Sequence, residues 1–145
     1  MIRHAEFEDI PSLLPLLSEL GYPCELEDFK ARFLRFLSNP GYGVAVCQID
    51  SEIVGFAAWS KSNLFVLDKV RFHIEALVVA EKYRGKGIGK ELMIFVETIA
   101  KQHLPAIVDL TSGLRRAGDG SHEFYKRLGY QNEGQMAKLY LRKEL

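Results

Sequence analysis

The sequence predicts an α/β fold in which helices cover a mixed β-sheet. Strand-like runs outnumber helical ones, lie next to each other in the first half of the chain, and alternate with helices in the second half. That order is expected when helices pack on the faces of a mixed sheet. The chain has 145 residues, a hydrophobic content of 48% and no Pro/Gly/Ser-rich linker. These features predict a single domain over residues 1–145.

Composition argues against polyanionic and membrane partners. The 19 basic residues balance 19 acidic ones, so the chain lacks the broad positive field of a nucleic-acid binder. No apolar run is longer than five residues, as in Ala76 to Ala80, whereas a membrane-spanning helix needs about 20. Glu6, Glu8 and Asp9 stand where a secretory signal would be apolar. We therefore expect a cytoplasmic protein with no nucleic-acid or membrane partner.

Two helices are expected after a short opening strand. The first is indicated by apolar residues at helical spacing: Ile10, Leu13, Leu14, Leu17 and Leu20. Asp9 is a candidate N-cap and Gly21 a stop signal, whereas Pro15 should kink this helix or shift its start. The second helix ends at residues 39–41 and has one apolar face, made of Phe29, Phe33, Phe36 and Leu37.

The middle of the chain predicts paired strands. Two β-rich runs, residues 44–49 and 53–59, are separated by the polar turn Asp50-Ser51-Glu52, which predicts an antiparallel hairpin. The later elements are expected in this order: a connection of uncertain form over 61–69, a strand over 72–79, a helix from Ile88, a strand over 107–111, a polar loop over 112–120, a helix from Ser121 and a last strand over 137–141.

The strongest functional signal is a glycine cluster between the expected strand and helix. Gly85, Gly87 and Gly89 alternate with basic or apolar residues at the helix start. Three glycines in one place indicate that the backbone adopts unusual φ angles or closely approaches a ligand. The first turn of a helix has N–H groups without partners and a partial positive charge, so a phosphate is the expected ligand. Arg84, Lys86 and Lys90 add positive charge nearby.

This cluster has three other interpretations. A P-loop requires Ser or Thr after its Gly-Lys pair, but Glu91 follows Lys90. A dinucleotide fingerprint requires Gly-x-Gly-x-x-Gly, and the spacing here is different, although Asp109 lies at about the right distance. The third alternative is a helix packed closely on a strand, with its basic residues in solvent.

Two motifs in this chain resemble those of one known family. The run from Ile74 to Val79, followed by Tyr83 to Gly89, is similar to the acetyl-CoA signature of the GNAT superfamily of N-acyltransferases, with Arg84, Gly87 and Gly89 at the motif positions. The run Ser121 to Tyr130 is similar to the family's later Phe-Tyr helix. The opening strand and helix agree as well, so the resemblance spans nearly the whole chain.

The resemblance implies a mostly antiparallel sheet that is splayed where acetyl-CoA binds. The pantetheine arm would enter beside Leu77, Val78 and Val79, and the pyrophosphate would rest on backbone N–H groups at the cluster. The implied cofactor-binding residues there are Arg84, Gly85, Lys86, Gly87, Ile88, Gly89 and Lys90. The implied reaction is acetyl transfer to a primary amine, expected to be a small aminoalkyl compound, by direct attack in a ternary complex.

Two residues are candidates for the proton transfers of this reaction. Tyr125 matches the family tyrosine that protonates the departing thiolate. The alternative is a structural tyrosine whose ring packs in the core and whose hydroxyl forms a hydrogen bond with the backbone. Glu75 matches an acidic residue proposed as base in several similar enzymes, and the alternative is an ordinary acid on a sheet face. His122 is a candidate proton relay or a surface histidine at a helix start. Arg115 and Arg116 could grip an anionic substrate group or the cofactor's 3'-phosphate, or lie in solvent.

Other chemistries are less favoured by the sequence. His4, His73 and His103 are scattered and match no metal-ligand spacing, so no metal is expected. An acyl-cysteine route would need Cys24 or Cys47 beside a base. The functional alternatives are acetylation of a protein N-terminus or lysine and a non-catalytic acyl-CoA binding module. A homodimer is possible.

Overall fold

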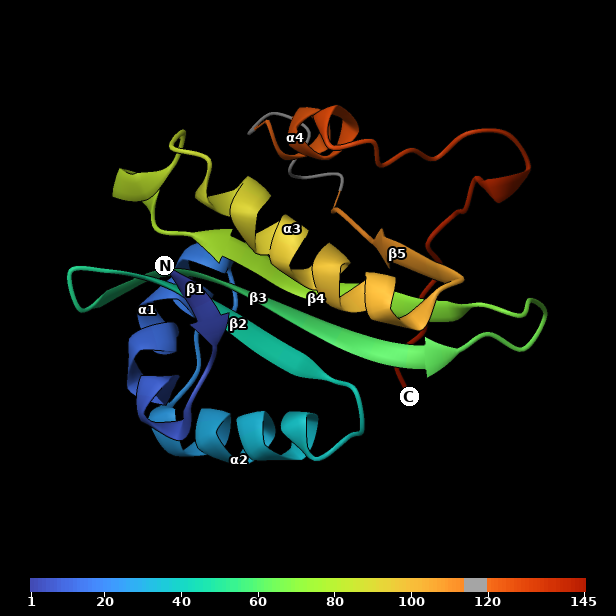
Figure 1. The fold of residues 1–145 in the computed structure, drawn as a ribbon. Helices are drawn as coiled ribbons and strands as arrows, with labels where there is room; N and C mark the ends of the chain where they lie inside the picture. Colours follow the sequence, from blue (N-terminus) through green and yellow to red (C-terminus); the bar gives the residue numbers. More distant parts are fainter. Residues whose placement is uncertain (114–119) are drawn as a thin grey trace. The chain divides into compact units, whose positions relative to one another are not determined.

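The computed structural model describes residues 1–113 and 120–145, which group into two compact units, Met1–Val108 and Asp109–Leu145 (Figure 1). Its elements are β1 (Ile2–His4), η1 (Phe7–Asp9), α1 (Ile10–Leu20), α2 (Leu26–Leu37), β2 (Gly43–Ile49), β3 (Glu52–Asn63), β4 (Val70–Val79), η2 (Glu81–Tyr83), α3 (Ile88–Ala100), η3 (Lys101–His103), β5 (Ala106–Leu110), α4 (Ser121–Arg127) and η5 (Gly134–Met136). No helix among the described residues is both long and apolar enough to span a membrane.

The strands form one sheet in the order β1-β2-β3-β4-β5. The first four pair antiparallel with their neighbours. β5 begins beside the start of β4, because the N–H of Val70 donates to the carbonyl of Pro105 at 3.0 Å. Adjacent strands that begin at the same edge run parallel, so the sheet is mixed and mostly antiparallel. The expected fold class is thereby confirmed.

Helices cover both faces of the sheet, with α3 on one face and α1 and α2 on the other (Figure 1). The α1–α2 face buries a cluster that includes Leu13, Phe33, Phe56 and Val78. On the opposite face, Leu92 of α3 is fully buried. The strands therefore supply side chains to cores on both faces, as alternation along a strand requires.

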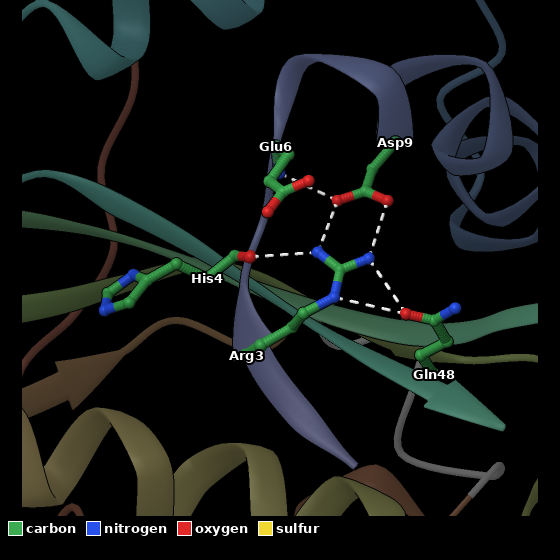
Figure 2. A network of polar contacts seen from close by, with 5 residues as sticks. All are labelled: Arg3, His4, Glu6, Asp9 and Gln48. Carbon is green, nitrogen blue, oxygen red and sulfur yellow. Dashed lines mark hydrogen bonds and ion pairs between the residues drawn. The ribbon is translucent and has the colours of Figure 1, made fainter. Parts of the chain in front are cut away.

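The two predicted N-terminal helices are present, but the predicted role of Asp9 is wrong. Gly21 ends α1 with a φ of 104°, as expected, and Pro15 lies inside the helix without moving its start. The Asp9 carboxylate makes no capping bond to α1. It instead accepts two hydrogen bonds from Arg3, at 2.7 and 2.9 Å, and one from the backbone N–H of Glu6 (Figure 2). The charged guanidinium on β1 competes successfully for this carboxylate, because charge-assisted pairs are stronger than neutral caps.

The predicted hairpin is confirmed, and its strands are longer than expected. Asp50 and Ser51 have φ angles of 47° and 66°, as a two-residue primed turn requires. β3 continues to Asn63 and β4 begins at Val70, so residues 61–63 of the connection that the sequence left undefined are strand. Pairing with β4 extends β3 beyond the strand that its local composition predicts.

The predicted last strand over residues 137–141 is wrong. The part of the chain that the structure describes has no strand after β5. Leu139, Tyr140 and Leu141 are between 67% and 81% exposed. An alternating pattern forms a strand only when the segment pairs with a neighbour and buries one face, and this segment does neither.

Candidate functional site

The segment between β4 and α3 presents a row of backbone donors. Among the described residues, none of the six N–H groups of residues 85–90 reaches a hydrogen-bond acceptor with good geometry. The first N–H of α3 with a partner is that of Glu91, which donates to Gly87 at 3.0 Å. α3 has 13 residues, so its aligned peptide dipoles add a partial positive charge at this end. The row is therefore suited to an anion.

Two glycines give the segment its shape. Gly85 and Gly87 have φ angles of 76° and 84°, a left-handed conformation that costs other residues about 1–2 kcal/mol. A Cβ atom added at either position would meet no atom within 4 Å. Backbone conformation, and not crowding by the protein, is thus the reason for glycine here. The open space is available to a ligand.

Three cations of this segment have no carboxylate partner among the described residues: Arg84, Lys86 and Lys90. The Nε of Arg84 donates to the carbonyl of Val79 at 3.0 Å, which fixes the arginine against the end of β4. Lys86 Nζ lies 5.3 Å from the ring centroid of Tyr83, within cation–π range. Positive charge is therefore concentrated beside the row of N–H groups.

Two carboxylates hold the preceding turn, η2, in place. Glu19 of α1 accepts from the N–H of Glu81 at 3.2 Å. Glu52 binds Lys82 Nζ at 3.2 Å and accepts from the Tyr83 hydroxyl at 3.1 Å. The hydrogen bonds from Lys82 and then Tyr83 lower the pKa of Glu52. Because Glu52 neutralises Lys82, the surplus charge belongs to the residues that follow η2.

Glu75 lies at a β-bulge in β4. Trp59 pairs with Ile74, and the preceding residue of β3, Ala58, pairs with Ala76. Glu75 is thus the extra residue on β4, and such bulges bend a strand and redirect its side chains. The Glu75 side chain is exposed and accepts a hydrogen bond from the hydroxyl of Ser60 at 2.7 Å. This carboxylate is oriented and open to solvent, as a base for an incoming substrate must be.

The end of β4 that contains Leu77, Val78 and Val79 is followed directly by η2 and the glycine segment. β5 has five residues against ten in β4 and begins beside Val70. A strand of that length can pair with only half of β4, the half that contains its start. The edge of the C-terminal half therefore extends beyond this pairing and offers backbone groups to an extended ligand.

The second unit contains the other predicted catalytic residue, Tyr125, on α4. Its ring is partly buried and lies 5.0 Å from Phe124 and 6.2 Å from Tyr130, between centroids. His122 contacts the carbonyl of Gly113 through Nε2 at 3.2 Å. Glu75 and the glycine segment thus lie in the first unit, and Tyr125 and His122 lie in the second. Arg115 and Arg116 lie outside the described residues.

Sequence patterns did not mark Ser60, Arg71 or His73 as residues of the candidate site. Arg71 and His73 precede Glu75 at a spacing of two along β4, which is the signal that would have found them. Cys47 is buried in β2, and Cys24 is partly buried beside α1 and α2. Within residues 1–113 and 120–145, no group of three or more His, Cys, Asp or Glu side chains is arranged to hold a metal ion.

A mixed sheet, a glycine-rich segment before α3 and a bulge in the preceding strand are the features of an acetyltransferase fold of the GNAT type. A model of the Acetyltransferase (GNAT) family matches residues 10–130. The chain therefore belongs to the GNAT family of N-acetyltransferases.

Individual relatives agree with this assignment. The chain is 29% identical to an aminoalkylphosphonate N-acetyltransferase of Salmonella typhimurium, over 90% of this chain and 84% of the relative. It is 37% identical to an uncharacterized N-acetyltransferase of Archaeoglobus fulgidus, over 63% of this chain and 67% of that protein. A crystal structure of a GNAT family acetyltransferase from Staphylococcus aureus superposes with a TM-score of 0.81 at 24% identity, covering 100% of this chain and 98% of that one.

Proposed function

We propose that this protein transfers the acetyl group of acetyl-CoA to the primary amine of a small molecule. The observation that carries the proposal is the row of six N–H groups over residues 85–90, none of which has an acceptor within the described residues. GNAT enzymes generally use acetyl-CoA. The similarity to an aminoalkylphosphonate N-acetyltransferase supports a small amine as the acceptor.

The residues of the first unit fit the donor in two places. The pyrophosphate would accept hydrogen bonds from the N–H groups of residues 85–90, with Arg84, Lys86 and Lys90 balancing its charge. The open edge of β4 at Leu77, Val78 and Val79 would hold the pantetheine arm. The bound thioester supplies the activated acetyl group.

Glu75 prepares the acceptor in this proposal. A primary amine is mostly protonated at neutral pH, and the ammonium ion has no lone pair with which to attack. Glu75 takes the proton directly or through one water, and the hydrogen bond from Ser60 holds its carboxylate in place. The amine nitrogen then bonds to the acetyl carbon, and the carbon–sulfur bond breaks as the Tyr125 hydroxyl donates a proton to the leaving sulfur. The nitrogen releases its remaining extra proton to solvent, which gives the neutral amide, and the Tyr125 phenolate takes a proton back from solvent.

Much of the rate enhancement would come from positioning. Holding donor and acceptor together along one strand replaces a bimolecular encounter, an effect worth up to about 7–11 kcal/mol in well-oriented systems. Residues 1–145 act as one functional domain in this proposal.

Release of CoA, measured across small amines, amino acids, polyamines, aminophosphonates and peptides, tests the proposal. We expect turnover with a small amine, and loss of acetyl-CoA binding in calorimetry when Gly87 is replaced by Glu, which introduces negative charge at the cradle. Binding of acetyl-CoA without turnover of any amine would instead support a non-catalytic binding module. Turnover of peptides alone would support a protein acetyltransferase.

A further inference from the structure

The loop between β3 and β4, which projects from one end of the sheet (Figure 1), carries an exposed apolar run. Four apolar residues, Leu64 to Leu67, follow the end of β3. Phe65 is fully exposed, Val66 is 81% exposed and Leu67 is 50% exposed. Consecutive exposed apolar residues are unfavourable on a surface unless they bind something. The tip of this hairpin therefore has the character of an interaction surface.

Backbone hydrogen bonds hold the tip in a defined shape. The N–H of Leu64 donates to the carbonyl of Lys69 at 3.1 Å and closes the loop at its base. The N–H of Val70 donates to the carbonyl of Pro105 at 3.0 Å and ties the hairpin to the segment before β5. All four residues belong to the first unit. Because the tip is already ordered, a partner that binds it pays a smaller entropic cost.

A small cleft lies beside the exposed tip, with a volume of about 250 Å³. Small-molecule sites typically measure about 300–1,000 Å³, so this cleft suits a single large side chain better than a substrate. Phe65 does not line the cleft, and Leu104, which does, is 71% exposed. The apolar lining comes from the hairpin and from the segment before β5: Leu64, Leu67, Val70, Leu104 and Pro105.

A protruding side chain beside a cleft of matching size makes this surface complementary to itself. In a two-fold dimer the same patch serves both copies, so a protrusion of each copy fills the cleft of the other. Asp68 and Lys69, which line the cleft, have opposite charges, so this pair gives two identical surfaces no net charge with which to repel each other. An anionic membrane would instead favour a cluster of cations.

The size of the tip predicts a dimer that dissociates on dilution. A buried aromatic side chain removes about 150–250 Å² from solvent, whereas a standard stable interface buries about 800 Å² on each partner. Phe65 would supply the central anchor, since aromatic residues dominate the binding energy of interfaces. The exposed apolar neighbours Val66, Leu67 and Leu104 would surround it.

We propose that two copies of this chain form a symmetric dimer in which Phe65 of each copy inserts into the cleft beside the hairpin tip of the other. The sequence left a homodimer open without indicating a surface. β4 has ten residues between the hairpin tip and the segment that leads to the glycines, which corresponds to roughly 30 Å. The interface is therefore remote from the proposed donor site, and this inference does not depend on the proposed function.

Sedimentation velocity of the full chain, from low micromolar to several hundred micromolar protein, measures the Kd of the dimer. The wild type should change from monomer to dimer within this range. Phe65→Ala should raise the Kd at least about 30-fold, as expected for the loss of a central aromatic anchor. Phe7→Ala is the matched control, because Phe7 of η1 is 50% exposed, and it should keep the Kd within about 2-fold.

Leu104→Arg tests the same contact from the side of the cleft, since it adds bulk and charge to the lining. It should also raise the Kd at least about 30-fold. A mixture of the two variants should associate more tightly than either variant alone. Phe65 of the Leu104→Arg copy can still enter the intact cleft of the Phe65→Ala copy, which restores one of the two insertions. Thermal unfolding checks that each variant folds, and either folded variant by itself tests the interface.

Four results would overturn the inference. The first is a wild type that stays monomeric at every concentration, and the second is a dimer whose Kd neither Phe65→Ala nor Leu104→Arg changes, because it then uses another surface. The third is weakening by both variants without recovery in the mixture, which would mean that the tips pack on each other without insertion. The fourth is a monomer that binds phosphatidylserine vesicles in a flotation assay and loses this binding in Phe65→Ala, which would make the tip a membrane-binding loop.

Discussion

Replacing Asp9 by Asn should destabilise the fold by about 2–3 kcal/mol at pH 7, because it breaks a largely buried ion pair. The Asp9 side chain is 10% exposed and that of Arg3 is 26% exposed. Asn keeps the shape of the side chain but removes its charge and one acceptor oxygen. Arg3 would be left with its charge partly desolvated, and the N–H of Glu6 would lose its partner or compete for one oxygen (Figure 2).

The magnitude follows from two opposing contributions. Removing one partner of a fully buried pair costs about 3–5 kcal/mol. Arg3 is partly exposed, and it also donates to Gln48 Oε1 from Nε and an Nη atom at 3.2 and 3.0 Å, so some of its interactions survive. For a chain of this length, a loss of 2–3 kcal/mol corresponds to a decrease of about 4–12 °C in Tm.

The pH dependence has a definite sign. The hydrogen bonds from Arg3 hold the pKa of Asp9 below its ordinary value of 3.8. A carboxyl group with a lowered pKa contributes stability that is present above its unfolded-state pKa and is lost as the pH falls through its folded-state pKa. The advantage of wild type over Asp9→Asn should therefore be complete near pH 6 and shrink below about pH 4.

Urea unfolding of wild type and Asp9→Asn at several pH values measures both effects. Glu8→Gln is the matched control, since Glu8 is an exposed neighbour, and it should change stability by less than about 0.5 kcal/mol. Adding Arg3→Met to Asp9→Asn should recover part of the loss by removing the unpaired charge. An Asp9→Asn effect as small as that of Glu8→Gln, or one unchanged between pH 6 and pH 3, would refute the reasoning.

Three further predictions concern the proposed reaction. Gly87→Ala should raise the Kd for acetyl-CoA at least about 10-fold in calorimetry, because the left-handed backbone that directs the N–H groups costs Ala about 1–2 kcal/mol. The control Gly21→Ala introduces the same strain at the end of α1 and should leave the Kd within about 2-fold. Equal Kd values for the two variants would exclude the proposed pyrophosphate site at residues 85–90. Tyr125→Phe should lower kcat about 100-fold with little change in acetyl-CoA affinity, and a normal kcat in a chemistry-limited assay removes Tyr125 from the mechanism. Glu75→Gln should depress activity most at low pH and recover partly toward the pKa of the amine; a defect that is independent of pH would indicate a binding or folding role instead.

Local sequence patterns were sufficient to predict the structure wherever it depends on residues that are close together in the chain. The apolar spacing that predicts α1 and α2 reflects faces that are buried whatever the remaining topology, and Gly21 ends α1 because a residue without Cβ tolerates its φ of 104°. The glycine segment is of the same kind. Its positive φ angles and unpartnered N–H groups depend on Gly85, Gly87 and the start of one helix, all close together in the chain.

The candidate site was only partly predictable from the sequence. The motif positions indicated the proposed donor end, because a family pattern over contiguous residues encodes a backbone shape. The surroundings of Glu75 were not indicated, since its partner Ser60 is 15 residues away and the bulge that exposes it is a property of strand pairing.

The sequence alone was enough to predict the fold class, the order of most elements and the glycine segment before α3, since each depends mainly on interactions within a few residues. Tertiary structure decided the partner of Asp9, the register that places Arg71 and His73 beside Ser62 and Ser60, and the failure of residues 137–141 to form a strand. In each case the outcome involves groups on different secondary-structure elements. The outcome depends on which of them the fold brings within hydrogen-bonding distance.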